Sequence, residues 1–156
     1  MKLSELINDI DFELSNLKRI EQESSKLIFI VKDNKADIYQ VSAAALMLAQ
    51  FYNGIENTLK RICKFKKITL PSGEQSHIEL FQWFSDIGKE GLPVFFDAKN
   101  KEGFSILRRF RHYVFHGYAF YLEWDKLKVG ILSLEHLLQH FQIKIDLFIK
   151  RQSGGK

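Results

Sequence analysis

The sequence has few of the residues that cross-linked, zinc-bound or β-rich proteins depend on. Cys63 is the single cysteine among 156 residues, so neither an internal disulfide nor a cysteine-based zinc site can form. Only two prolines occur, while Leu, Ile, Phe and Lys are abundant, which favours long helices over a many-turned β fold. These scarcities predict an all-α protein of a reducing compartment, and we expect it to be cytoplasmic.

Long uncharged hydrophobic segments are also missing. The first twenty residues, MKLSELINDIDFELSNLKRI, are charged throughout, which argues against a secretory signal. The most apolar helical stretch, Val41 to Phe51, is shorter than the roughly 18 residues that a membrane helix needs. Since 46% of the residues are hydrophobic, the chain can bury a core, and we expect a soluble protein without a membrane partner.

Apolar residues recur at three- and four-residue steps along most of the chain, which is typical of amphipathic helices. The spacing predicts helices over residues 3–30, 38–67, 77–87, from 97 or 100 to Gly117, and 133–149. Gly54 inside the second helix indicates a close helix contact, and the apolar connector 91–100 should pack on the bundle. We therefore predict an all-α up-down bundle of four to five helices, forming one domain over residues 1–150 with a frayed tail at 151–156.

Charge is distributed unevenly, although the net charge is only +4. Residues 1–40 carry six basic and eight acidic side chains, whereas residues 99–111 carry five basic side chains against Glu102 alone. Such a cationic stripe is compatible with a phosphate-bearing partner. Taken alone, the charge favours the simpler interpretation, a solvated helix face.

The segment RRFRHYVFHGY, from Arg108 to Tyr118, crowds cations, imidazoles and phenols onto one helix end. An arginine such as Arg111 can bind two phosphate oxygens and neutralise charge that grows in a transition state. A histidine such as His116 can exchange a proton near neutral pH with a ribose 2′-hydroxyl or a leaving oxygen. This pair suffices for RNA cleavage without a metal, because the 2′-hydroxyl is itself the nucleophile.

Helix geometry complicates this pairing. Arg111 and Tyr118 are seven residues apart and should share a helix face, whereas Arg111 and His116 lie about 140° apart around an ideal helix. Either Gly117 marks a local distortion, or two subunits complete the site. The second alternative predicts a two-fold homodimer with the motif helices facing each other.

The stretch Arg111-His-Tyr-Val-Phe-His116-Gly-Tyr118 reads R-x4-H-x-Y and resembles the motif of HEPN-domain toxins of the HepT group. The segment FYNGIENTLKRI resembles the second bundle helix of these proteins, and SGEQSHIELFQWF resembles the loop and helix that follow. FRHYVFHGYAFYLEWDKL resembles their motif helix as it runs on into the final helix. The chain departs from many family members at His112, where an Asn or another short polar residue is common.

The resemblance implies a dimeric helical ribonuclease toxin that needs neither a metal nor another cofactor. It implies that Arg111 and His116 are catalytic, and that Tyr118 is where a nucleotidyltransferase antitoxin of the MNT type attaches AMP. Beside them we expect Arg108, Arg109 and His112 to bind RNA phosphates. The substrate would be RNA, with tRNA as one candidate.

Other interpretations compete with these assignments. His112 and His116 lie four residues apart, as metal ligands can, but no acidic residue occurs between Glu102 and Glu123. Tyr118 could instead be a buried aromatic residue. The remaining histidines, His77, His136 and His140, are most simply explained as surface or core-edge residues.

Two residues of the second helix, Asn53 and Glu56, could support the site from across the bundle, although a solvent-exposed helix face is the favoured interpretation for both. For the whole protein, the main alternative is a non-catalytic helical module that partners a nucleotidyltransferase. A nucleotide-binding protein ranks last, because the sequence has no Gly-rich phosphate loop.

Overall fold

The computed structural model describes residues 1–154 and is built from helices. In chain order the elements are α1 (Leu3–Ile30), α2 (Ile38–Phe65), α3 (Ser76–Trp83), α4 (Lys101–His116), the 3-10 turn η1 (Ala119–Tyr121) and α5 (Trp124–Ser153). Within these residues there is no strand, only an isolated bridge between Ser85 and Phe96. The prediction of an all-α bundle is confirmed.

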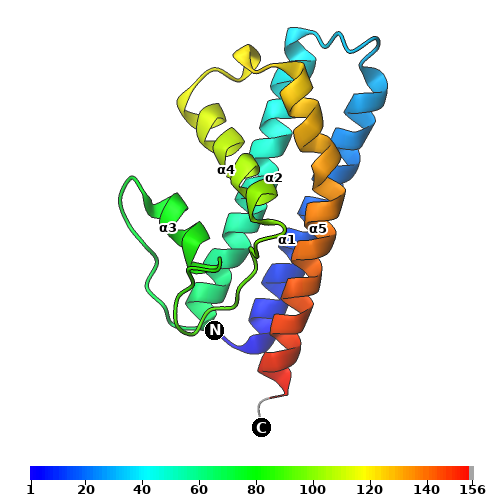
Figure 1. Cartoon of the computed structure of the whole chain (residues 1–156). Coiled ribbons are helices and arrows are strands. Elements are labelled where there is room, and N and C mark those ends of the chain that lie inside the picture. The colour runs from blue at the N-terminus through cyan, green and yellow to red at the C-terminus, as the bar shows by residue number, and fades with distance from the viewer. Residues whose placement is uncertain (155–156) are drawn as a thin grey trace.

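Helix α2 is the centre of the bundle. It contacts α1, α3, α4, η1 and α5. Figure 1 shows α1, α2 and α5 running side by side along the long axis, while the shorter α3 and α4 lie on one side of α2. Both termini lie at the same end of the molecule. Residues of α2 are therefore placed to reach side chains on every other helix.

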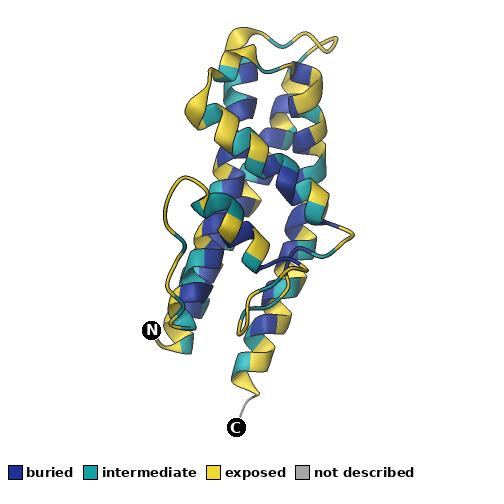
Figure 2. Cartoon of the chain, turned by 60° about the vertical axis from the view of Figure 1, so that its left-hand side comes forward, coloured by how far each residue is buried: buried dark blue, intermediate teal, exposed yellow. Residues whose placement is uncertain are grey.

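Each long helix buries one apolar stripe. In α1, Leu6, Ile10 and Leu17 are fully buried, at the spacing that the sequence predicted. Figure 2 shows the same division along the bundle, with buried residues turned inward and exposed residues outward. At the start of α2, Asp37 accepts a hydrogen bond from the Gln40 backbone, and the Gln40 side chain accepts one from the Asp37 backbone. This capping box fixes where α2 begins.

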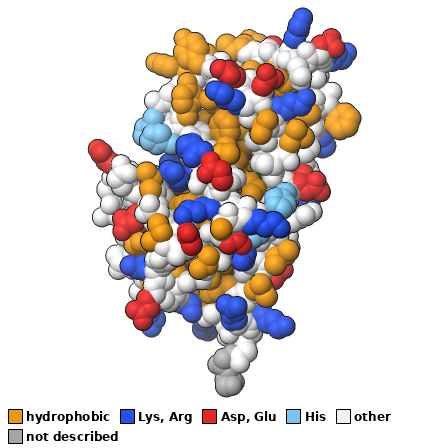
Figure 3. All heavy atoms as spheres, in the orientation of Figure 1, with side chains coloured by type: hydrophobic (Ala, Val, Ile, Leu, Met, Phe, Trp, Pro, Cys, Tyr) orange, Lys and Arg blue, Asp and Glu red, His pale blue; other side chains and the backbone are white. Residues whose placement is uncertain are grey.

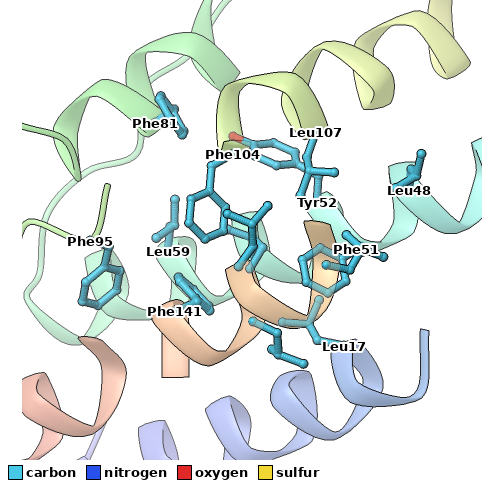
Figure 4. Close-up of a cluster of buried hydrophobic side chains, with 14 of the residues drawn as sticks. Leu17, Leu48, Phe51, Tyr52, Leu59, Phe81, Phe95, Phe104, Leu107 and Phe141 are labelled. Carbon is cyan, nitrogen blue, oxygen red and sulfur yellow. The ribbon is translucent and has the colours of Figure 1, made fainter. Parts of the chain in front are cut away.

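The core joins α2, α4 and α5 through large side chains, among them Tyr52, Phe104, Leu107 and Phe141 (Figure 4). The connector between α3 and α4 belongs to this core. Its Phe96 stacks on Phe81 with the ring centroids 4.4 Å apart, and the neighbouring Phe95 is also buried. The prediction that residues 91–100 pack on the bundle is confirmed.

The close contact expected at Gly54 is also present. A Cβ atom at this position would lie 2.7 Å from Cδ2 of Leu17 in α1. The two helices therefore approach more closely here than any larger residue would allow without a shift of Leu17.

Two predicted helix boundaries are wrong. Helix α3 ends at Trp83 rather than at residue 87, because the Phe84 carbonyl accepts hydrogen bonds from the backbone of both Phe95 and Phe96. Helix α5 begins at Trp124 rather than at residue 133. Its first turns pack tightly, since a Cβ atom at Gly130 would lie 3.0 Å from Leu48 and 3.3 Å from Phe110.

The predicted C-terminal tail needs a correction as well. Helix α5 continues to Ser153, so residues 151–153, expected to be frayed, are helical. The remaining part of that prediction, residues 155–156, lies outside the described residues.

Candidate functional site

The candidate site is built on the C-terminal half of α4. The first half of this helix carries its buried residues, Phe104, Ser105 and Leu107. After Leu107 the side chains are partly or fully exposed. The Gly117 N–H makes the last helical hydrogen bond, to the Tyr113 carbonyl at 2.7 Å, and the extended backbone of Gly117 ends the helix. The apolar half thus anchors the helix in the core, while the polar half remains accessible to a ligand.

Arg111 is held in place by residues of two other helices. Its Nε donates to Oδ1 of Asn53 in α2 at 3.0 Å, and its Nη1 lies 3.2 Å from Nε2 of His77 in α3. The guanidinium carbon also lies 5.0 Å from the centre of the Phe115 ring, within the range of a cation–π contact. A long side chain that is otherwise free to move is therefore restricted to one orientation.

Glu56 lies behind His77 and is only 2% exposed. Its Oε2 is 2.7 Å from Nδ1 of His77, and its Oε1 is 2.6 Å from Nζ of Lys60. Burial opposes ionisation of this carboxyl group, but the hydrogen bonds from Lys60 and His77 outweigh burial and lower the pKa of Glu56 below its ordinary value. Glu56 is therefore a buried carboxylate at neutral pH.

These residues border a pocket of about 410 Å³ between α3 and α4. The pocket is lined by Glu74, Gln75, His77, Ile78, Arg108, Arg109, Arg111, His112 and Tyr113. Figure 3 shows histidine and basic side chains side by side at the left edge of this face, next to a hydrophobic area. Three guanidinium groups and two imidazoles around one pocket form a site suited to an anion.

Two of these arginines differ in how they are bound. Arg109 forms an exposed ion pair with Glu102, with Nη2 2.9 Å from Oε1. Arg108 lies over the Phe81 ring at 5.8 Å, and its buried Nε has no hydrogen-bond partner among residues 1–154. The Nε of Arg108 is thus a buried donor without a partner, whereas Arg109 would have to give up a surface carboxylate to bind a ligand.

A buried phenol lies close to the same groups. The hydroxyl of Tyr52 is buried and has no partner within residues 1–154. Burial, together with the nearby charge of Glu56, raises the pKa of Tyr52, and the cations Arg108 and Arg111 offset only part of this shift. Tyr52 therefore stays a neutral phenol beside the charged residues.

The structure brings together four of the six predicted site residues, Arg108, Arg109, Arg111 and His112, around the pocket. His116 does not line the pocket. Its ring packs against that of His112, with the centroids 4.5 Å apart, at the exposed last turn of α4. A single chain therefore does not place both predicted catalytic side chains at the pocket.

Tyr118 lies outside α4. Gly117 ends the helix, so the prediction that Arg111 and Tyr118 share a helix face is wrong. Tyr118 is 66% exposed, which also overturns the alternative of a buried aromatic residue. Its ring packs against those of Phe120 and Tyr121, at centroid distances of 5.7 and 5.9 Å.

The contacts that hold Arg111 were only partly expected. Asn53 and Glu56 were named as possible supports of the site, but an exposed helix face was favoured for both, and His77 was expected at the surface or core edge. One signal was available for Glu56. It lies four residues after Tyr52 and three before Leu59, both fully buried, so helical periodicity places its carboxylate on the buried face. A carboxylate there requires a partner.

The other two histidines form a separate cluster with Asn100. Nε2 of His136 lies 3.0 Å from Oδ1 of Asn100, and Nδ1 of His140 lies 2.8 Å from its Nδ2. Nε2 of His140 lies 3.2 Å from the Phe95 carbonyl. These contacts agree with the core-edge interpretation of His136 and His140.

Two features are absent from residues 1–154. No group of three or more His, Cys, Asp or Glu side chains in this range is arranged to hold a metal ion. Within the same residues, no helix combines the length and the apolar character of a membrane-spanning segment.

Comparison with known proteins identifies the family. A family model described as HepT-like protein matches residues 43–152, a range that includes most of α2, all of α3 and α4, and nearly all of α5. No curated protein and no solved structure matches the chain. The resemblance carried by R-x4-H-x-Y is confirmed at the level of the family, because the match covers more than half of the sequence. The chain is a member of the HepT-like family of HEPN-like helical proteins.

Proposed function

We propose that this protein is a metal-independent endoribonuclease that acts as a toxin, with an RNA phosphate bound at Arg111. The observation that carries the proposal is the fixed position of Arg111, hydrogen-bonded to Asn53 and His77 at the edge of a pocket that Arg108 and His112 also line. A preorganised guanidinium stabilises charge on a phosphate without reorganising during the reaction. Membership of the HepT-like family supports the assignment.

In the proposed reaction, the ribose 2′-oxygen attacks the adjacent phosphorus and the bond from phosphorus to the 5′-oxygen breaks. The proton of the 2′-hydroxyl passes to a base, and an acid protonates the departing 5′-oxygen. The products are a 2′,3′-cyclic phosphate and a 5′-hydroxyl. His116 exchanges one of these protons, and Arg111 neutralises the extra charge on the phosphate oxygens.

We propose that a homodimer completes the site. His116 lies outside the pocket, and α4 is regular up to this residue, so His116 is about 140° around the helix from Arg111. A two-fold axis near the end of α4 brings His116 of the partner subunit to the pocket of the first. Exposed aromatic side chains at and just after this end are available for the contact: Phe115, Phe120 and Tyr121.

The proposed neutralising partner is a nucleotidyltransferase antitoxin. It would transfer AMP from ATP to the phenolic oxygen of Tyr118, releasing pyrophosphate. The exposure of Tyr118 supports this assignment, because the transfer requires an accessible hydroxyl. An attached AMP adds a bulky anion near the cationic helix end and would compete with RNA.

The test is cleavage of intact cellular RNA by the purified protein with a chelator present. We expect wild type to cut RNA to 2′,3′-cyclic phosphate ends, and His116→Ala to lose about 10²–10⁴-fold in rate, the usual contribution of an acid–base group. His136→Ala is the matched control and should cut as wild type does, because His136 contacts Asn100 away from the pocket. Equal cleavage by wild type and His116→Ala would refute the assignment.

The second candidate is a non-catalytic module that binds a nucleotidyltransferase. The exposed aromatic cluster of Tyr118, Phe120 and Tyr121 favours this alternative, since such a surface suits a protein partner. Absence of cleavage by unmodified dimeric wild-type protein, combined with stable binding of the transferase, would support it over the ribonuclease.

A further inference from the structure

His77 is bonded on both sides by groups whose hydrogen-bonding roles are fixed. Arg111 has only N–H donors, so Nε2 of His77, 3.2 Å from Nη1 of Arg111, must be the acceptor. Glu56 is ionised and can only accept, so Nδ1 of His77, 2.7 Å from Oε2 of Glu56, must carry the proton. The contacts therefore require one state of the ring, the neutral form with its proton on Nδ1.

We propose that Glu56 and His77 are positioning residues, which hold Arg111 at the pocket only while the His77 ring is neutral. A proton bound at Nε2 would remove the acceptor and place a second positive charge against the guanidinium. Arg111 would then keep its contact with Asn53 but lose its contact with α3. The consequence for catalysis rests on the proposed ribonuclease function, and cleavage should fall as His77 becomes protonated.

The donor inventory of Arg111 agrees with a positioning role. A guanidinium has five N–H bonds. In this structure one is used by Asn53 and one by His77, which leaves three for phosphate oxygens. His77 therefore does not have to be displaced when a phosphate binds. Instead, Asn53 and His77 fix the plane of the guanidinium, and the quality of a two-oxygen contact depends on that plane.

Charged groups lie on both sides of the His77 ring. Glu56 contacts its Nδ1 and Arg111 contacts its Nε2, while Lys60 binds the other oxygen of Glu56. The side chains of Glu74, Arg108, Arg109 and His112 line the same pocket. On protonation, the ring keeps its hydrogen bond to Glu56 and repels Arg111, so the contact that breaks is the one on the side of the pocket.

The catalytic test compares two substitutions of the same histidine across pH. His77→Gln keeps one amide acceptor and one amide donor but cannot titrate, whereas His77→Ala removes both contacts. At pH 8 we expect His77→Ala to cut RNA about 10–100-fold more slowly, as a displaced catalytic group does, and His77→Gln to remain within about threefold of wild type. At pH 5.5 the rate of His77→Gln relative to wild type should rise by about tenfold. His136→Gln, the same change in the other cluster, should follow wild type at both pH values.

Two results would overturn the proposal. If His77→Gln is as slow as His77→Ala at pH 8, the ring itself transfers a proton or is needed for its shape. If the profiles of wild type and His77→Gln are parallel, protonation of His77 does not control the site.

A second measurement does not depend on catalysis. Side-chain ¹⁵N spectra of the labelled protein without RNA report which nitrogen of His77 carries the proton, and they follow the Nε–H signal of Arg111. We expect the proton on Nδ1 at pH 8. The Arg111 signal should shift between pH 8 and 5.5 in wild type but not in His77→Gln. A proton on Nε2 at pH 8, or an Arg111 signal that does not change with pH, would refute the positioning role. If wild type cuts no RNA at any pH, the ribonuclease proposal fails, and these spectra still decide whether His77 controls Arg111.

Discussion

Two of the molecule's histidine clusters, the one at His77 and the one at His136 and His140, differ in the charge of their partners. His77 lies between a buried carboxylate, Glu56, and the guanidinium of Arg111, at the edge of an open pocket. His136 and His140 lie on either side of the Asn100 amide. The first cluster is charged and faces a pocket, while the histidine rings of the second form hydrogen bonds with neutral groups only, and the Asp97 carboxylate lies at its edge, bonded to Asn100. The same residue type thus takes part in a candidate binding site in one region and in fold stability in the other.

The neutral cluster connects elements that are distant in sequence. Asn100 precedes α4, its two histidines come from α5, and Nε2 of His140 is within 3.2 Å of the carbonyl of Phe95 in the connector. Its hydrogen bonds use both polar atoms of the Asn100 amide and both ring nitrogens of His140. In the charged cluster, Arg111 still has N–H donors for a ligand. Substitutions that change one cluster at a time test this difference.

Among substitutions that change one of the two clusters, the largest effect is expected for Arg111→Lys. Lysine keeps the positive charge but lacks the planar fork that bonds Asn53, His77 and a phosphate at once. We expect RNA cleavage to fall about 10²–10³-fold, as when one preorganised donor is lost, while the free energy of unfolding changes little. The measurement is the cleavage rate at saturating RNA together with urea denaturation.

Arg61→Lys is the matched control for this variant. Arg61 forms an ion pair with Asp9 between α2 and α1, with Nη1 2.8 Å from Oδ2, and it does not line the pocket. The cleavage rate of Arg61→Lys should stay within about twofold of wild type, because Arg61 does not line the pocket and an exposed ion pair contributes little to folding stability. An equal loss in both variants would mean that general positive charge, not the geometry of Arg111, supports cleavage.

Asn100→Ala should have the next largest effect, and on stability instead of cleavage. Asn100 is 4% exposed, and the substitution leaves ring nitrogens of His136 and His140 without their partner. We expect the free energy of unfolding to fall by about 2–3 kcal/mol, the cost of buried polar groups that lose a hydrogen bond. Urea denaturation measures this loss, and cleavage below the melting transition should be unchanged. A tenfold loss of cleavage in the folded variant would mean that the two clusters are coupled.

The helices and the cationic end of α4 could be predicted from the sequence, because both depend on local patterns. The apolar spacing in α1 gave its bounds, and the buried residues Leu6, Ile10 and Leu17 follow it. Helix α5 was predicted too short. In the structure it begins at Trp124, and Gly130 in its second turn lies against Leu48 and Phe110. That contact is tertiary, and no local pattern reports it.

The contacts that hold Arg111 could not be predicted for a related reason. Asn53 and His77 reach Arg111 from 58 and 34 positions away in sequence. No periodicity connects α2, α3 and α4 in this way. What the sequence offered was a polar residue, Glu56, on an otherwise apolar stripe, and such a residue signals a buried partner without identifying it. The pairing depends on how the three helices pack around α2.

The smallest effect is expected for Asp97→Asn, at the edge of the neutral cluster. Burial opposes ionisation of Asp97, but hydrogen bonds from Lys144 and the Asn100 backbone outweigh it and lower the pKa of Asp97. Because the pKa of Asp97 is lower in the folded state than in the unfolded state, its carboxylate stabilises the fold at pH values above the unfolded-state pKa, which is near 4. This contribution is lost as the pH falls through the folded-state pKa. Since the side chain is 36% exposed, solvent screening limits the contribution to roughly 0.5 kcal/mol at pH 7.

Urea denaturation should show that wild type and Asp97→Asn differ at pH 7 and converge towards pH 3, whereas their cleavage profiles coincide between pH 5.5 and 8. A cleavage profile altered by Asp97→Asn would mean that the charge of this cluster reaches the pocket, and the two histidine clusters would then act as one.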